Sequence, residues 1–230
     1  MPQGSQIQSM FARIAGRYDL LNHLLSFGLD RYWWRAMARF SGGGPNDCLL
    51  DVAAGTGDSS LALARRGARV VCSDFTMEML RRGQPKFRRG AGLNILGSVG
   101  ADALHLPFRE DCFDGLAICY GIRNVENRSR ACREFLRVLR SGGRLTVLEF
   151  SRPRQAWLRV LSECYTGHLL PVLGGGVSGD PAAYRYLPDS ISAFPGPEGL
   201  AAEIAAAGFR EVHWRRLSGG IVALHGAEKP

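Results

Sequence analysis

Residues 49–58 read LLDVAAGTGD, an apolar segment that includes a carboxylate and passes into a loop of small residues. Residues 59–64 then have the composition of a helix, so the chain is predicted to run through a strand, a tight turn and a helix. Gly55 and Gly57 would let a ligand lie against the backbone N–H groups at the start of that helix, because glycine places no side chain in the way. The pattern is typical of a nucleotide-binding α/β protein.

The loop does not match a dinucleotide fingerprint. The pattern G-x-G-x-x-G would require a third glycine where Ser60 stands, and the carboxylates of Asp51 and Asp58 flank the loop. These carboxylates would repel a pyrophosphate but attract the sulfonium and ammonium groups of S-adenosylmethionine. The loop therefore favours a methyltransferase, and the alternative is a glycine-rich turn in an ordinary α/β domain. The cofactor-binding candidates in this segment are Asp51, Gly55, Thr56 and Gly57.

A second carboxylate extends the predicted cofactor site. A strand is predicted over 69–73 and is followed by Asp74, which lies 19 positions after Gly55. In folds of this kind, an acidic residue about 20 positions after the glycine loop binds the ribose hydroxyls of an adenosine. The alternative is that Asp74 caps the helix predicted over 76–87, and the two roles are compatible.

Two residues after the next strand are candidates for contact with an adenine ring. Asp102 and Ala103 follow the apolar run 94–99. The carboxylate can accept a hydrogen bond from the adenine amino group, and the small alanine lets the ring approach. Without the glycine loop, the same residues would be interpreted as an ordinary loop.

The rest of the chain alternates between strand and helix patterns. Strands are predicted near 48–53, 69–73, 94–99, 113–119, 143–150, 209–217 and 220–225. Helices are predicted near 7–16, 20–26, 32–40, 59–66, 76–87, 128–139 and 199–207. This order predicts a Rossmann-like α/β fold with a seven-stranded, mostly parallel sheet and an antiparallel C-terminal hairpin. Residues 1–230 are expected to form one domain, with 153–196 as a helical insertion over the ligand edge of the sheet.

Composition narrows the class of protein further. The sequence has no stretch of 18 apolar residues, no C-x-x-C pair among its six cysteines and no H-E-x-x-H motif among its five histidines. A membrane-spanning protein, a disulfide framework and a metal site are therefore not expected. The formal net charge of +8 favours an anionic partner. The arginines are dispersed and accompany no nucleic-acid-binding motif, so an anionic membrane surface fits better than nucleic acid.

Four further motifs carry a family resemblance. Residues 18–33 read YDLLNHLLSFGLDRYW, 121–125 read GIRNV, 137–151 read RVLRSGGRLTVLEFS, and 184–187 read YRYL. With these motifs the chain resembles the ubiquinone/menaquinone C-methyltransferase family from about residue 11 to its C-terminus. The resemblance implies a class I methyltransferase that uses S-adenosylmethionine to methylate a ring carbon of a polyprenylated hydroquinol.

The resemblance favours methylation of demethylmenaquinol to menaquinol. The ubiquinone precursor, a polyprenyl methoxybenzoquinol, and another isoprenoid lipid are alternative substrates. A non-catalytic cofactor-binding partner in a quinone-synthesis complex is an alternative of a different class, and the pair Arg123 and Asn124 argues against it. The sequence leaves the quinone ring, the tail length and the oligomeric state open, a homodimer included.

The chemistry that the family implies predicts roles for four residues. A ring carbon becomes nucleophilic when the neighbouring hydroxyl loses its proton, so the site must stabilise a phenolate. Arg123, just after the predicted fourth strand, would stabilise that charge, since a guanidinium with a pKa above about 12 is a poor base. Asn124 would orient the quinol oxygen, His168 is the candidate proton acceptor, and Tyr18 would orient the ring or relay a proton. The structural alternatives are an ion pair between Arg123 and Glu149 and a helix-capping role for His168.

The sequence departs from the family pattern at four positions. Asp30 stands where a histidine is usual, Ala54 where a glycine is usual, and Ser141 where a proline is common. Cys119 stands where some members have a serine near the cofactor, and it stays a cofactor-site candidate whose hydrogen bonds would be weak. Asp30 puts any role of the family histidine in doubt.

The N-terminal segment 1–41 is predicted to form a helical lid. Large apolar residues are interleaved here with arginines: Phe11, Ile14, Tyr18, Leu21, Leu25, Phe27, Trp33 and Trp34, with Arg13, Arg17, Arg31 and Arg35. The segment is expected to close over the polyprenyl tail and to bind an anionic bilayer surface, and the alternative is a helix face packed on the domain. The protein is thus expected in the cytoplasm, peripheral on the inner face of the cytoplasmic membrane.

Overall fold

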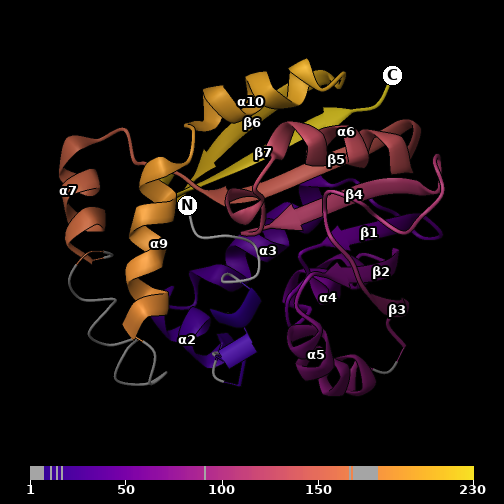
Figure 1. Ribbon diagram of the computed structural model, residues 1–230, viewed down its shortest axis with the longest axis horizontal. Coiled ribbons are helices and arrows are strands. Elements are labelled where there is room, and N and C mark those ends of the chain that lie inside the picture. The colour runs from indigo at the N-terminus through magenta and orange to yellow at the C-terminus, as the bar shows by residue number, and fades with distance from the viewer. Residues whose placement is uncertain are drawn as a thin grey trace.

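The computed structural model describes residues 8–10, 12–13, 15–16, 18–90, 92–165, 167 and 181–230. In this part of the chain, seven strands form one sheet with the order β3-β2-β1-β4-β5-β7-β6 (Figure 1). The strands are β1 (Cys48–Val52), β2 (Arg69–Asp74), β3 (Ile95–Gly100), β4 (Phe113–Cys119), β5 (Leu139–Phe150), β6 (Arg210–Leu217) and β7 (Val222–Glu228). The predicted α/β class with a seven-stranded sheet is confirmed.

Strand directions also follow the prediction. Strands β1 to β5 pair in parallel, and β7 pairs antiparallel with both β5 and β6. The last two strands therefore form the predicted hairpin, and β7 lies between β5 and β6. The central strands β1 and β4 are almost entirely buried, because helices cover both faces of the parallel part of the sheet.

The helices form a layer on each face of the sheet (Figure 1). One face carries α3 (Leu29–Phe40), α4 (Asp58–Ala64) and α5 (Met77–Arg89), and the other carries α6 (Arg128–Val138) and α10 (Pro197–Ala206). The sheet is thus the middle layer of three, and its carboxyl edge is left for a ligand.

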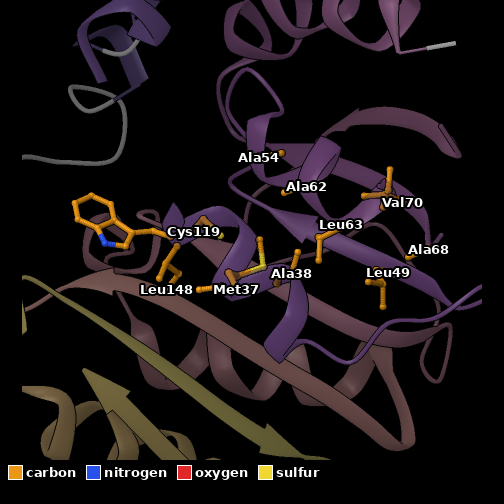
Figure 2. Close-up of a cluster of buried hydrophobic side chains, with 14 of the residues drawn as sticks. Met37, Ala38, Leu49, Ala54, Ala62, Leu63, Ala68, Val70, Cys119 and Leu148 are labelled. Carbon is orange, nitrogen blue, oxygen red and sulfur yellow. The ribbon is translucent and has the colours of Figure 1, made fainter. Parts of the chain in front are cut away.

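The first helix layer joins the sheet through a closely packed apolar cluster. Figure 2 shows Met37 and Ala38 of α3 near Leu63 of α4 and Leu148 of β5. Met37, Leu63 and Leu148 are completely buried, and each large side chain stabilises the fold by roughly 1.5–3 kcal/mol. The packing holds α3 against the same part of the sheet that carries the glycine loop.

Three helices lie toward the carboxyl ends of the central strands. Beyond the ends of β4 and β5 lie α7 (Ala156–Cys164) and α9 (Pro181–Ala193), both within the predicted insertion (Figure 1). The third helix is α2 (Tyr18–Leu25), and Phe27 just after it has its ring centroid 5.7 Å from that of Tyr165, just after α7. None of the described helices is long and apolar enough to cross a bilayer.

The two N-terminal helices differ in how they pack. Trp33 of α3 is buried, and its indole Nε1 donates a hydrogen bond to Ser218 Oγ at 2.9 Å. The inner face of α3 is therefore part of the core, and the packed-helix alternative describes this helix. In contrast, Leu20 and Leu24 of α2 and the neighbouring Phe27 are exposed.

Two strand boundaries differ from the prediction. Strand β5 begins at Leu139 instead of near 143, because its pairing with β4 shifts register and admits a bulge with Gly142 at φ 75°. Strand β7 continues to Glu228, whereas the predicted strand ends near 225, so Gly226 lies within the strand. A Cβ at Gly226 would lie 2.6 Å from Phe40 Cε1, so the glycine permits a close approach between the strand and α3.

Candidate active site

The glycine loop lies at the carboxyl end of β1, where open α/β sheets bind ligands. Gly55 and Gly57 have φ values of 57° and 85°, in the left-handed region that favours glycine. Gly57 also has no room for a side chain, since a Cβ would lie 2.3 Å from the ring of Phe87 in α5. Both the backbone and the packing therefore require glycine where the chain turns from β1 into α4.

Asp51 is buried in β1, next to this loop in the sequence. Its Oδ2 accepts hydrogen bonds from the hydroxyls of Ser59 and Ser60, at 2.6 and 2.5 Å, whereas its Oδ1 has no partner in the described part of the chain. Burial raises the pKa of Asp51 to about 6, although the two serine hydroxyls act to lower it. A buried carboxylate oxygen without a protein partner is a suitable acceptor for a cationic ligand group.

Asp74 organises the loops at the same edge of the sheet. Its carboxylate accepts hydrogen bonds from the backbone N–H groups of Gly55, at 2.8 Å, and Thr76, at 2.7 Å. The contact with Thr76 lies at the start of α5, so the capping alternative is partly present in the structure. Burial raises the pKa of Asp74, and the two N–H groups lower it. Each oxygen keeps a lone pair for a ligand hydroxyl, and the ribose role stays a prediction.

Asp102 and Ala103 lie beside Asp74 in the loop after β3. The Ala101 N–H donates to the Asp74 carbonyl at 3.0 Å, which joins this loop to the end of β2. Asp102 Oδ1 accepts from the N–H of Leu104 at 2.9 Å, and Ala103 is half-buried. The structure thus brings the glycine loop, Asp74 and Asp102 together at one edge, as the sequence pattern predicts.

Thr56 connects the glycine loop to the N-terminal helix α2. Its hydroxyl donates to Asp19 of α2, and Lys86 of α5 lies 2.7 Å from Asp19, 2.9 Å from Asp58 and 3.1 Å from Thr56 Oγ1. The Thr56 side chain is therefore engaged within the protein. No local sequence pattern predicts this polar network, which holds α2 against the glycine loop.

Strand β4 delivers two residues to the site, one expected and one missed. Burial raises the pKa of the Cys119 thiol well above its usual range, and the carboxylates of Asp51 and Glu149 raise it further. The thiol is therefore uncharged. The next residue, Tyr120, has a φ of 56°, and no described residue forms a hydrogen bond with its buried hydroxyl. Burial also raises the pKa of Tyr120, so this hydroxyl stays a hydrogen-bond donor.

Arg123 stands in a short 3-10 turn, Ile122–Asn124, directly after β4. Its Nη1 donates to Glu149 Oε1 and to the Tyr120 carbonyl, both at 2.6 Å, and its guanidinium lies 5.4 Å from the centre of the Phe150 ring. The ion-pair alternative is therefore present in the structure. Both members of the pair are buried, yet Arg123 Nε has no hydrogen-bond partner among the residues that the structure describes. Arg123 is thus bonded through one nitrogen and has an unsatisfied donor on another.

Asn124 is held by the predicted insertion. Tyr186 of α9 donates its hydroxyl to Asn124 Oδ1 at 2.9 Å. Burial raises the pKa of Tyr186, so the hydroxyl keeps the proton that it donates. The motif YRYL at 184–187 thus contributes a side chain to the site, a role that the sequence analysis did not assign.

An apolar cavity of about 700 Å³ lies between these elements. It is lined by Trp33 and Trp34 of α3, Tyr120, Arg123, Phe150 and Ile221 at the end of the sheet, Leu158 and Leu161 of α7, and Tyr186 and Ile191 of α9. Phe27, Tyr165 and Met10 line it as well. Cavities of this size and lining bind small apolar ligands. The end at Arg123 is buried, and the end at Phe27 is exposed.

Two predicted site residues cannot be placed, and one departure from the family pattern lies at the cavity wall. His168 and the side chain of Tyr18 lie outside the part of the chain that the structure describes. Asp30, at the position where the family usually has histidine, is buried and lies 3.1 Å from His23 Nδ1. Asp30 also lines the cavity, so the departure places a carboxylate at its wall.

The fold places the protein in a structural class. The [4+2]-cyclase SpnF superposes with a TM-score of 0.73 at 18% identity, covering 100% of this chain and 97% of that one. A SAM-dependent methyltransferase of Thermotoga maritima, described as a possible histamine N-methyltransferase, gives 0.66 at 17% identity, covering 96% and 99%. At these identities the likeness concerns the fold. The fold is that of Rossmann-like methyltransferases.

The sequence then places the chain in a family. Residues 2–229 match the model of the ubiE/COQ5 methyltransferase family, and the chain belongs to this family. The demethylmenaquinone methyltransferases of Mycolicibacterium paratuberculosis and Mycobacterium marinum are each 45% identical over 224 residues, which cover 97% of this chain and 94% of each relative. The protein is an S-adenosylmethionine-dependent methyltransferase.

The groups at the carboxyl edge of the sheet fit this cofactor. S-adenosylmethionine carries positive charge on its sulfonium and ammonium groups, and Asp51 Oδ1 is a buried acceptor without a partner among the described residues. The glycine loop allows a ligand to approach the backbone closely, since Gly55 and Gly57 have no side chains. Polar acceptors for the adenosine part are present in Asp74 and Asp102.

We expect S-adenosylmethionine to bind more weakly as the pH falls below about 6. The pKa of Asp51 is raised to about 6, and a cationic ligand favours the ionised carboxylate over the protonated one. Affinity should therefore fall about tenfold per pH unit below the pKa and level off above it. Calorimetric titration at pH 5, 6, 7 and 8 measures this. The control variant Asp51→Asn should bind weakly with a flat profile, and a slope retained in that variant would contradict the assignment.

Proposed function

We propose that the protein methylates a ring carbon of demethylmenaquinol, a polyprenylated hydroquinol, to form menaquinol. The observation that carries this proposal is the apolar cavity of about 700 Å³, which is lined at its buried end by Tyr120 and Arg123. Within the described part of the chain, the buried Arg123 Nε and Tyr120 hydroxyl have no hydrogen-bond partner. A hydroxylated aromatic ring with a prenyl chain matches this combination. The names of the relatives, demethylmenaquinone methyltransferases at 45% identity, support the choice of this quinol.

Arg123 is proposed to stabilise the phenolate that makes the ring carbon nucleophilic. The Glu149 carboxylate lies 2.6 Å from Arg123 Nη1, so the pair is neutral as a whole. Stabilisation then comes from the directed N–H of Nε, together with the Tyr120 hydroxyl, and not from an excess of positive charge. A pair of donors fixed in a buried site needs little rearrangement when negative charge develops on the quinol oxygen.

Asn124 and Tyr186 are proposed to orient the quinol oxygen. Because Tyr186 donates to Asn124 Oδ1, the amide is turned so that its NH₂ group is available to a substrate oxygen or a water molecule. Tyr186 is thus a positioning residue that acts through Asn124. His168 stays our proposed proton acceptor, and Tyr18 our proposed ring-orienting residue.

The proposed cofactor contacts follow from the geometry of the loops. Asp51 would accept from the ammonium group, Gly55 and Gly57 would admit the methionine part to the backbone, and Asp74 would accept from the ribose hydroxyls. Further contacts are proposed for Thr56, Asp102, Ala103 and Cys119. Bound S-adenosylmethionine supplies the electrophilic methyl group. The described helices α2, α7 and α9 would cover the site within one domain and exclude water from it.

We also propose that the protein is cytoplasmic and works at the inner face of the cytoplasmic membrane. A polyprenyl tail is retained by the bilayer, because each methylene costs about 0.8 kcal/mol to expose to water. An enzyme that methylates the ring therefore has to meet it at the membrane surface.

Methyl transfer by the purified protein tests the proposed function. Labelled S-adenosylmethionine is incubated with short-chain demethylmenaquinol or with a short-chain methoxybenzoquinol, both dispersed in detergent and kept reduced. We expect the label on a ring carbon of the naphthoquinol, with the benzoquinol methylated more slowly.

Two results would overturn this proposal. Faster methylation of the benzoquinol would assign the protein to the ubiquinone precursor. Absence of transfer to both quinols, by a folded protein that binds S-adenosylmethionine, would favour another lipid substrate or the non-catalytic role. The matched control is the oxidised quinone, which lacks the ionisable hydroxyl and should accept no methyl group.

A further inference from the structure

Helix α7 has an apolar face that is open to solvent. Its residues Leu158 and Leu161 line the cavity. Trp157, Val160 and Leu161 are 67%, 57% and 59% exposed, at positions i, i+3 and i+4 of one helix face. No residue of α7 is fully buried. The helix therefore packs along one side only, and it presents an apolar stripe on the other.

The turn between α2 and α3 continues this stripe. Leu24 and Phe27 are 54% and 78% exposed, and the Phe27 ring centroid lies 5.7 Å from that of Tyr165, next to α7. Phe27, Leu161 and Tyr165 all line the cavity. Phe27 of the α2–α3 turn and the C-terminal end of α7 thus lie at the same exposed end of the cavity. The apolar rim is the set Leu24, Phe27, Trp157, Val160 and Leu161.

Basic side chains accompany the apolar rim. Arg152, Arg154 and Arg159 are exposed at the start of α7, with Glu163 as the single acidic residue between 152 and 164. Arg31 is exposed at the start of α3. Apolar residues flanked by arginines are typical of segments that lie in the interface of an anionic bilayer. Tryptophan, present here as Trp157, favours the headgroup level of such an interface.

We propose that the apolar rim is the surface by which the protein docks on an anionic lipid bilayer, with the exposed end of the cavity turned toward the membrane. This inference rests on the proposed function, since it identifies where a lipid-borne substrate enters. The polyprenyl tail would pass between α7 and the α2–α3 turn while the ring reaches Arg123 at the buried end. The docking surface shares Phe27 and Arg31 with the predicted N-terminal series, but it adds α7 and does not include Trp33, which lies in the core.

A second copy of the chain fits the apolar rim less well than a bilayer does. Self-association through the rim would cover the exposed end of the cavity with protein and block the entry of a tail. It would also bring the Arg152, Arg154 and Arg159 groups of two copies together, and like charges facing each other oppose association. An anionic bilayer instead covers the apolar side chains and attracts the arginines.

Vesicle flotation with a double variant tests the docking surface. Trp157→Ser with Val160→Ser removes two exposed apolar side chains that do not line the cavity. We expect wild-type protein to float with vesicles that contain phosphatidylglycerol, less with pure phosphatidylcholine, and less at high salt. The partition coefficient of the double variant should be lower by about tenfold or more, because bilayer binding scales with the buried apolar area. The matched control is Leu96→Ser, since Leu96 is 55% exposed on the edge strand β3, which lies on the opposite side of the molecule from α7 (Figure 1).

Tryptophan fluorescence gives an independent readout of the bound face. Of the four tryptophans, Trp157 is exposed, Trp33 is buried, and Trp34 and Trp214 are half-buried. Brominated lipids should therefore quench mainly the emission of Trp157. The variant Trp157→Phe should still bind vesicles, because it keeps an aromatic ring, but should lose most of the quenching.

The failures of the two proposals are distinguishable. Equal flotation of the wild type and the double variant, or quenching that survives in Trp157→Phe, would overturn the docking surface. So would sedimentation that reveals a dimer lost in the double variant, because the rim would then be a self-association surface. In each case the double variant should still methylate the detergent-dispersed short-chain quinol at the wild-type rate. Only the two wild-type results named above, faster methylation of the benzoquinol or absence of transfer to both quinols, would count against the proposed function.

Discussion

Replacing Arg123 with methionine should lower the free energy of unfolding by about 3–5 kcal/mol. The substitution leaves the buried Glu149 carboxylate without the guanidinium that lies 2.6 Å from it, and an uncompensated buried charge is costly. Urea denaturation followed by circular dichroism measures the change.

The second substitution Glu149→Gln, made in the Arg123→Met background, is the control. It removes the unpaired charge, and its one amide oxygen can keep one of the two backbone N–H bonds that the carboxylate accepts, from residue 123 at Oε2 or from Phe150 at Oε1. Part of the lost stability should therefore return in this double variant. A single variant as stable as the wild type would mean that the ion pair contributes nothing to the fold.

Replacing Arg123 with lysine should lower turnover about 10²–10³-fold while the affinity for S-adenosylmethionine stays nearly unchanged. Lysine can keep the charge beside Glu149, so the fold should be retained. It cannot present a second N–H group in the plane of a guanidinium, and the proposed contact of Nε with the quinol oxygen is lost. Turnover with short-chain demethylmenaquinol and calorimetric titration of the cofactor separate the two effects.

Arg128→Lys is the matched control for this experiment. Arg128 of α6 forms a two-point ion pair with Glu203 of α10, at 2.7 and 2.8 Å, on the other side of the sheet from α3. The same chemical change there should leave turnover unaltered. If Arg123→Lys has the turnover of the wild type, Arg123 is only a structural partner of Glu149.

The two Arg123 variants address alternatives that the sequence left open. From residue type alone, Arg123 was a candidate for phenolate stabilisation or for an ion pair with Glu149. The structure places the ion pair and an unsatisfied Nε on the same side chain, so the alternatives do not exclude each other. One nitrogen anchors the guanidinium, and another stays available to a ligand.

The local sequence determined the sheet, the glycine loop and the positions of the carboxylates around it. These features depend on short segments: strand and helix periodicities extend over a few residues, and Gly55 and Gly57 are required where φ is positive. Asp74 and Asp102 reach the same edge because they follow parallel strands, whose carboxyl ends necessarily lie together. The meeting of these residues at one edge could therefore be predicted, and their contacts with the cofactor stay a proposal.

Only the tertiary structure decided which side chains meet across the chain. Glu149 lies 26 positions from Arg123, Tyr186 lies 62 positions from Asn124, and Trp33 bonds to Ser218 across 185 positions. No local pattern encodes such pairs, because they depend on how strands and the insertion pack in space. The exposure of one side of α7 to solvent is likewise decided by tertiary packing. Its apolar spacing also suits a buried helix, and only the absence of a described packing partner on that side leaves Trp157 and Val160 facing solvent.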